Sequence, residues 1–227
     1  MAAARPPDVH RIAVPAAAEG GPRNAWLVAT PAACLVDPGP ATPAAYAALR
    51  DALAAHGFSI RDVAVIVLTH AHGGHAGLAA RLHAESGARV RAHPLALSAL
   101  ADPAAAVASR VDLARRAARA VGMPEALAAA ALTAWQRSLA AELGPDPAPL
   151  PRTAGQPVAD GEAALDAPGG PWTVHVAGGH APDHIVVVEM ARGLALTGDL
   201  IDRQHAVLPG LAPADAGTQG ARWPSVA

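Results

Sequence analysis

The sequence predicts an α/β fold, and three observations carry this prediction. Short apolar runs bounded by Gly and Pro alternate with longer helical segments in the first part of the 227-residue chain. One of these runs, at 63–68, consists almost entirely of branched apolar residues and is typical of a fully buried strand. Several histidines follow that strand directly, so polar chemistry is expected where a core strand ends.

The first elements are expected in the order hairpin, strand, helix, strand, helix, strand. We expect strands at 11–14, 26–29, 33–36, 63–68 and 90–93, and helices at 44–56 and 76–85. Thr42 suits the N-cap of the first helix, Pro43 suits its first position, and Gly57 ends it. Such alternation is typical of a mixed sheet with helical crossovers.

A pair of helices then interrupts the alternation. We interpret residues 102–143 as a helical insertion within a single domain that spans residues 1–227. A Pro-rich loop at 144–157 follows the insertion. After it, strands are expected at 157–167, 172–177, 185–189 and 194–197. Residues 206–227 lack any periodicity and are expected to form a loose tail.

Composition argues against several classes of protein. The formal net charge of −2 gives no reason to expect a nucleic-acid or membrane partner, and no apolar window is long enough for a membrane span. The N-terminal residues lack the apolar segment of a signal peptide, so a cytoplasmic location is expected. Cys34 lies in an apolar run and is expected to be a core residue, not a nucleophile. The oligomeric state stays open.

Potential metal ligands recur where predicted strands end. His70, His72 and His75 follow the strand at 63–68, and His180 and Asp199 each follow a later strand. Imidazole is a common ligand for zinc, and ligands at neighbouring strand ends converge on one edge of a sheet. A catalytic zinc takes three protein ligands and a water, which becomes a hydroxide nucleophile near neutral pH. The pattern therefore predicts a metal site.

The segment 69–75, Thr-His-Ala-His-Gly-Gly-His, resembles the His-x-His-x-Asp-His signature of metallo-β-lactamase-fold hydrolases. Segments 24–37, 179–184 and 197–199 resemble the first hairpin, the third-histidine segment and the bridging-aspartate segment of that family. The helical insertion is similar to that of a bacterial branch related to hydroxyacylglutathione hydrolases. The resemblance covers about residues 10–203, in the family's order. It implies an αββα sandwich of the metallo-β-lactamase type, with an incomplete C-terminal part.

Roles for single residues follow from this resemblance. It implies that His70, His72 and His180 bind the first zinc, that His75 belongs to a second metal site, and that Asp199 bridges the two. Asp199 is also the expected catalytic base, which orients the attacking water. The implied activity is zinc-dependent hydrolysis of a small-molecule thioester, ester or lactone by a metal-bound hydroxide.

Two departures from the family pattern weaken the second metal site. The aspartate of the signature is replaced by Gly74, which offers no ligand, and no histidine follows His205 to supply the family's last ligand. We therefore expect a mainly mononuclear site with one zinc. The alternative is a catalytically degenerate or truncated family member that keeps the fold and one structural metal. A third hypothesis is that His205 or Asp183 rebuilds the second site. Asp37 is expected to support the loops, and His184 to face solvent or pair locally.

Overall fold

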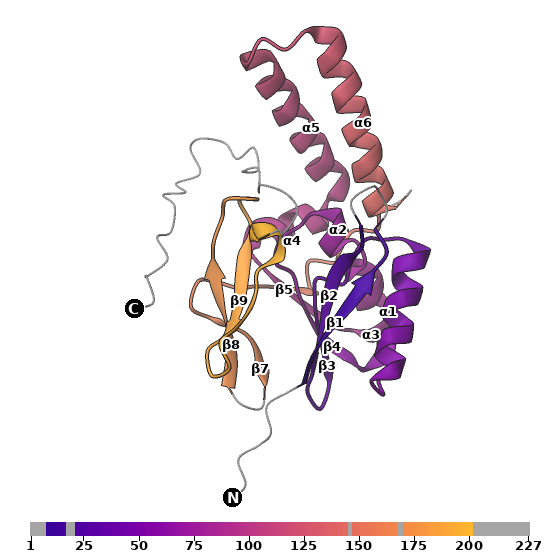
Figure 1. Ribbon diagram of the computed structural model, residues 1–227, viewed down its shortest axis with the longest axis vertical. Helices are drawn as coiled ribbons and strands as arrows, with labels where there is room; N and C mark the ends of the chain where they lie inside the picture. Colours follow the sequence, from indigo (N-terminus) through magenta and orange to yellow (C-terminus); the bar gives the residue numbers. More distant parts are fainter. Residues whose placement is uncertain (1–7, 17–20, 145–146, 168–169, 202–227) are drawn as a thin grey trace, which may run out of the picture.

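Two β-sheets lie face to face, and helices cover the outer face of the first sheet (Figure 1). The computed structural model describes residues 8–16, 21–144, 147–167 and 170–201. The predicted α/β class is therefore confirmed. Residues 206–227, the expected tail, lie outside the described residues, as does His205.

The first sheet has the strand order β1-β2-β3-β4-β5-β6. Its strands are β1 (Asp8–Val14), β2 (Arg23–Ala29), β3 (Ala33–Val36), β4 (Val63–Val67), β5 (Arg89–Ala92) and β6 (Gly155–Pro157). β1 to β3 pair antiparallel, whereas β3 to β6 pair parallel. Helical crossovers join β3 to β4 and β4 to β5, as the alternating pattern predicts. These two crossovers contain α1 (Pro43–Ala55), the short 3₁₀ turn η1 (Ile60–Asp62), α2 (Gly73–Ala76) and α3 (Ala79–Ser86).

The second sheet is antiparallel, with the order β10-β9-β8-β7. Its strands are β7 (Ala163–Ala167), β8 (Gly170–Val176), β9 (Ile185–Glu189) and β10 (Leu194–Leu196). No α-helix follows β6 in the part of the chain that the structure describes. Nor is any helix within the described ranges long and apolar enough to cross a membrane.

Each face of the first sheet belongs to a different core. Leu35 and Ile66 pack with Leu49 of α1 on the outer face, while Val36 packs toward Trp172 in the space between the sheets. Cys34 is buried in this second core, as expected, and burial raises the pKa of its thiol. β3 and β4 are therefore fixed on both faces, which makes their ends a rigid base for the loops that follow.

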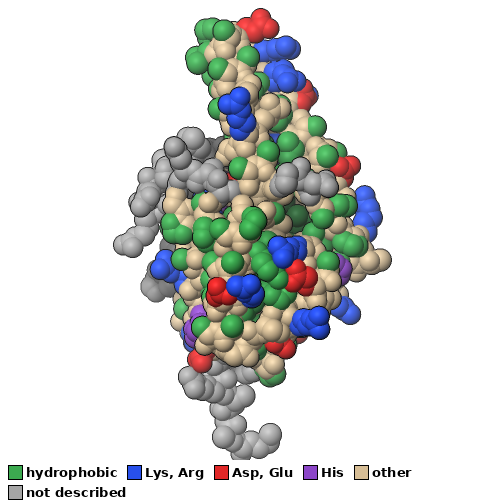
Figure 2. Space-filling model, turned by 90° about the vertical axis from the view of Figure 1, so that its right-hand side faces the viewer, with side chains coloured by type: hydrophobic (Ala, Val, Ile, Leu, Met, Phe, Trp, Pro, Cys, Tyr) green, Lys and Arg blue, Asp and Glu red, His purple; other side chains and the backbone are tan. Residues whose placement is uncertain are grey.

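The insertion is larger than the sequence predicts. It contains α4 (Pro94–Ala101), which the sequence analysis missed, then α5 (Pro103–Ala120) and α6 (Glu125–Leu143). α5 and α6 form a hairpin that projects away from the sheets (Figures 1 and 2). The end of α6 returns to the body of the protein, where the carbonyl of Glu142 accepts a hydrogen bond from the amide of Ala41 at 2.8 Å. β6 was also missed, because it lies in the Pro-rich stretch that we interpreted as a loop.

Candidate metal centre

The loops that follow strands of both sheets meet at one edge of the sandwich. β8 and β10 both run antiparallel to β9, so both end at the same edge of the second sheet. The amide of Ile185, the first residue of β9, donates to the carbonyl of Thr69 at 2.8 Å and ties this edge to the end of β4. The structure therefore brings the histidine loop after β4 next to the loops that carry His180 and Asp199.

Four of the predicted site residues converge. His70 and His72 lie in the loop after β4, His180 lies between β8 and β9, and Asp199 lies in the 3₁₀ turn η2 (Gly198–Leu200). One potential ligand atom from each of these four residues lies within 4.8 Å of all the others. The Nδ1 atom of His72 is 3.0 Å from Nε2 of His180. Three imidazoles and one carboxylate at this spacing are a donor set that suits zinc.

A chain of hydrogen bonds fixes the tautomer of His70. The hydroxyl of Thr69 donates to Asp37 Oδ2 at 2.6 Å, so it accepts from Nδ1–H of His70 at 3.0 Å. Nε2 of His70 then keeps its lone pair. This nitrogen is buried, has no hydrogen-bond partner among the described residues, and lies 3.9 Å from Oδ2 of Asp199. A buried imidazole nitrogen with a free lone pair fits a metal ligand, because buried polar atoms are otherwise paired.

The electrostatics keep the three histidines in the neutral form that binds metal. Burial lowers the pKa of His70 and His72 well below the ordinary value, and the charges of neighbouring histidines and of Arg110 lower it further. Burial also lowers the pKa of His180. Metal ligands must be deprotonated to bind. Because these three side chains are already neutral near neutral pH, they do not have to lose a proton before they bind a metal ion.

His75 is held between two carboxylates. Its Nδ1 lies 2.9 Å from Oδ2 of Asp37, and its Nε2 lies 3.1 Å from Oδ1 of Asp199. Burial opposes a charge on His75, but the charge of Asp37 and the hydrogen bonds to both carboxylates raise its pKa to about 10. Burial likewise opposes a charge on Asp199, but its hydrogen bond to His75 and the charge of that imidazolium keep its pKa below the usual value.

Asp37 organises the histidine loop from the end of β3. Besides His75, it accepts hydrogen bonds from the amide of Thr69 at 2.8 Å and from the Thr69 hydroxyl. It is also the non-glycine residue of the described ranges with a positive φ, of 53°. A strained backbone at a residue that makes three buried contacts is typical of a functional site. These contacts are the loop support that the family resemblance implies for Asp37.

His184 does not face solvent, contrary to the prediction. Its ring is fully buried and stacks on the ring of His70, with centroids 4.8 Å apart. Asp183 accepts a hydrogen bond from the amide of Ala71 at 2.7 Å, so it braces the histidine loop. Both residues directly precede β9, and that adjacency to a core strand was the available signal that they point inward.

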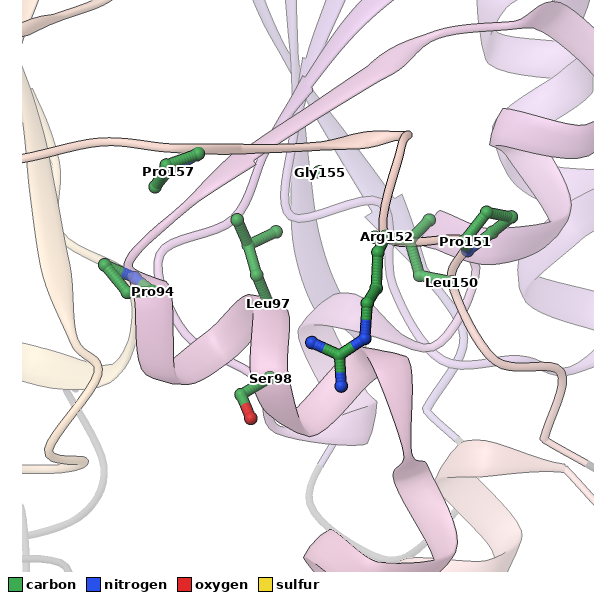
Figure 3. Close-up of a pocket in the computed structure, with 8 residues that line it drawn as sticks. All are labelled: Pro94, Leu97, Ser98, Leu150, Pro151, Arg152, Gly155 and Pro157. Atoms are coloured by element: carbon green, nitrogen blue, oxygen red, sulfur yellow. The ribbon is translucent and has the colours of Figure 1, made fainter.

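The structure also has a hollow between α4 and β6 (Figure 3). Pro94, Leu97, Ser98, Leu150, Pro151, Arg152, Gly155 and Pro157 line it. None of these residues belongs to the histidine and aspartate cluster. This hollow is therefore separate from the candidate metal centre.

Comparison with known proteins identifies the family. The family model of the metallo-beta-lactamase superfamily matches residues 18–221. The chain belongs to this superfamily. As a superfamily member, it is also similar to the probable metallo-hydrolase YqjP of Bacillus subtilis, with 42% identity over 71 residues. That match covers 31% of this chain and 22% of the Bacillus protein.

Solved structures of the superfamily share the fold. A metallo-beta-lactamase family protein from Thermus thermophilus has a TM-score of 0.70 and 25% identity, over 92% of this chain and 65% of that chain. A beta-lactamase domain protein from Burkholderia ambifaria has a TM-score of 0.66 and 23% identity, over 88% of this chain and 56% of that chain. The chain thus spans less than two thirds of each of these relatives. The metallo-β-lactamase fold predicted from the sequence is confirmed.

Proposed function

We propose that this superfamily member is a zinc-dependent hydrolase with a mainly mononuclear site. In this proposal His70, His72 and His180 hold the ion, and Asp199 completes the site. The observation that supports it most strongly is the convergence of these four side chains within 4.8 Å, with one buried imidazole nitrogen of His70 left without a partner among the described residues. The superfamily match adds that metal-dependent hydrolysis is the expected chemistry.

When bound, zinc would lower the pKa of a coordinated water and polarise a substrate carbonyl. The residues of the chain prepare this chemistry. Thr69 and Asp37 hold the tautomer of His70 that offers Nε2, and the ionised carboxylate of Asp199 can accept a proton at its Oδ2 atom. Nε2 of His75 lies 3.1 Å from the other oxygen of Asp199, and this ion pair favours one orientation of that carboxylate.

The proposed substrate is a small-molecule thioester, ester or lactone, as the resemblance to hydroxyacylglutathione hydrolases implies. We also propose a cytoplasmic enzyme without nucleic-acid or membrane partners, which the net charge of −2 supports. Fold does not fix substrate, so the substrate class has to be tested directly.

Zinc content and hydrolysis together test the proposal. The purified protein, reconstituted with excess zinc and dialysed, is expected to hold about one zinc per chain. It should also hydrolyse an activated thioester, ester or lactone, and removal of the zinc with a chelator should abolish that activity. A protein that holds no zinc after reconstitution would contradict the proposal.

A degenerate, non-catalytic superfamily member is the second candidate. Gly74 favours it, because the carboxylate of the family signature is absent there. In this case the protein holds about one zinc but hydrolyses none of the three substrate classes. A large gain of activity in Gly74→Asp would show that catalysis fails for want of that carboxylate.

A further inference from the structure

An ion pair borders the position where the family signature has its aspartate. Arg23 is the first residue of β2 and Glu142 lies in the last turn of α6, and Nη2 of Arg23 is 3.7 Å from Oε1 of Glu142. A Cβ atom added to Gly74 would lie 3.2 Å from Nε of Arg23 and 3.4 Å from Oε1 of Glu142. The two charged side chains therefore lie in the space next to residue 74 into which a longer side chain would extend.

Glycines in α2 and after it allow α6 to bring Glu142 into this position. A Cβ atom on Gly73 would lie 2.9 Å from Cβ of Glu142, and one on Gly77 would lie 2.8 Å from its carbonyl oxygen. Larger residues at either position would push the end of α6 away. The same carbonyl accepts from the amide of Ala41, so backbone contacts on both sides set the place of Glu142.

Arg23 adds a fixed positive charge to the centre. Its Nε atom is buried and makes no hydrogen bond to any described residue, although its guanidinium reaches Glu142. The charge of Arg23 also favours the ionised form of Asp199. Arginine stays charged at any pH that a folded protein meets. A divalent ion placed beside it would meet a like charge in a partly buried environment, where repulsion is poorly screened.

We infer that Arg23, held by Glu142, takes the place of the second metal ion and keeps the centre mononuclear. Gly74 and Arg23 are then two parts of one arrangement: the glycine removes a ligand, and the guanidinium supplies the second positive charge. This inference rests on the proposed zinc at His70, His72 and His180. It goes beyond it, because it assigns the exclusion of a second ion to a residue outside the histidine loop.

Zinc stoichiometry in a double variant tests the inference. We expect about one zinc per chain in the wild type, in Gly74→Asp and in Arg23→Met. Gly74→Asp keeps the guanidinium, and Arg23→Met still lacks a carboxylate at residue 74. Arg23→Met combined with Gly74→Asp should hold about two, since His75, Asp199 and the new carboxylate can then bind a second ion.

Two controls and a second neutral variant make the result specific. Arg23→Lys with Gly74→Asp keeps the positive charge and should stay at about one zinc. Arg81→Met with Gly74→Asp removes an exposed arginine that pairs with Glu85 and should also stay at about one. Arg23→Gln with Gly74→Asp is a second neutral variant in case the methionine variant fails to fold, as judged by circular dichroism.

Each outcome decides between the two proposals. About two zinc ions in the wild type or in Gly74→Asp would overturn the inference and leave the proposed zinc site standing. About one zinc in both neutral double variants, when folded, would also overturn it, since removal of the charge would then not admit a second ion. A wild type without zinc would instead overturn the proposed function, and this inference with it.

Discussion

The two halves of the centre share one loop but meet different neighbours. His70 and His72 turn toward His180, which the second sheet brings to the end of β4, and their nitrogens converge with Asp199. His75, which follows closely along the chain, meets Asp37 and Asp199, and its neighbour Gly74 faces the Arg23–Glu142 pair. A ligand signature therefore determines only which potential metal ligands the loop carries. The elements packed against the loop decide which of them can share an ion.

Replacing one histidine of each half in turn should give the largest difference between the two halves. His72→Ala is expected to weaken zinc binding by more than about 100-fold, above the range seen when only an indirect partner of a metal is lost. His75→Ala should keep about one zinc with a much smaller loss, because His75 lies in the other half. Zinc affinity measured by competition with a chelating dye checks both.

The exposed His56, which stacks on His10, provides the control. His56→Ala removes an exposed imidazole that lies outside the loop and should leave zinc affinity unchanged. Equal losses in His72→Ala and His75→Ala would show that the two halves act as one site, and our division of the centre would then be wrong.

The sequence predicts the residues of the first half from short local signals. A buried strand at 63–67 followed by histidines indicates a strand-end site, and the family signature then selects His180 and Asp199. The strands and crossovers up to residue 92 follow from periodicity and from the caps at Thr42 and Gly57. Each signal is a short stretch of sequence, and only the choice of His180 and Asp199 needs the family resemblance as well.

The second half depends on contacts between segments that are far apart in the chain. Nothing near residue 23 or residue 142 signals that Arg23 and Glu142 meet beside Gly74. That contact requires the hairpin of α5 and α6 to return to the sheet edge, and the register of two long helices is not readable from an Ala-rich sequence. β6, with a Gly and a Pro among its residues, has none of the usual strand composition and is fixed by its pairing with β5.

Asp37 links the two halves, and its charge can be removed with little change in shape. Asparagine tolerates the positive φ of this position nearly as well as aspartate, so Asp37→Asn tests the carboxylate itself. The hydrogen bonds from Thr69 and His75 would weaken, the tautomer of His70 would no longer be fixed, and zinc affinity should fall by about 10- to 100-fold.

Asp51, exposed and paired only with its neighbour Arg50 among the described residues, offers the matched change. Asp51→Asn should alter zinc affinity by less than about twofold, as expected for an exposed pair. If Asp37→Asn also leaves the affinity unchanged, the hydrogen-bond chain through Thr69 does not prepare His70 for the metal.

Two glycines of the same loop should respond differently to alanine. A Cβ atom on Gly77 would lie 2.4 Å from the amide nitrogen of Ala41 and 2.7 Å from the carbonyl of Gly73, both of them backbone atoms. Gly77→Ala should therefore lower the free energy of unfolding by about 1–3 kcal/mol. Gly74→Ala meets only side-chain atoms, at 3.2 Å or more, and gains helix propensity, so its effect should stay within about 1 kcal/mol.

Urea unfolding of the zinc-free proteins measures both glycine variants. The same comparison reports on the docking of α6, because a Cβ atom on Gly77 would also lie 2.8 Å from the carbonyl oxygen of Glu142. Equal losses for the two alanine variants would mean that the loop moves freely enough to absorb a Cβ atom, and that α6 does not fix it.

Of the changes considered, a change of pH should have the smallest effect on zinc binding by the wild type, and it should affect the two halves differently. The pKa values of His70, His72 and His180 all lie below the ordinary 6.5, so these ligands are neutral above that pH. Protons therefore do not compete with zinc at the first half between about pH 7.5 and about pH 6.5, and affinity should change by less than about threefold.

His75 differs, since its pKa of about 10 means that it must lose a proton before it can bind an ion. In the Arg23→Met and Gly74→Asp double variant, the second zinc should thus bind more tightly as the pH rises from about 7 toward about 9, while the first is unaffected. Isothermal titration at several pH values, with the protons released to buffers of different ionisation enthalpy, measures this difference. A first zinc whose affinity falls steeply below about pH 7.5, or a second zinc that binds without releasing protons, would show that the two halves do not differ in protonation.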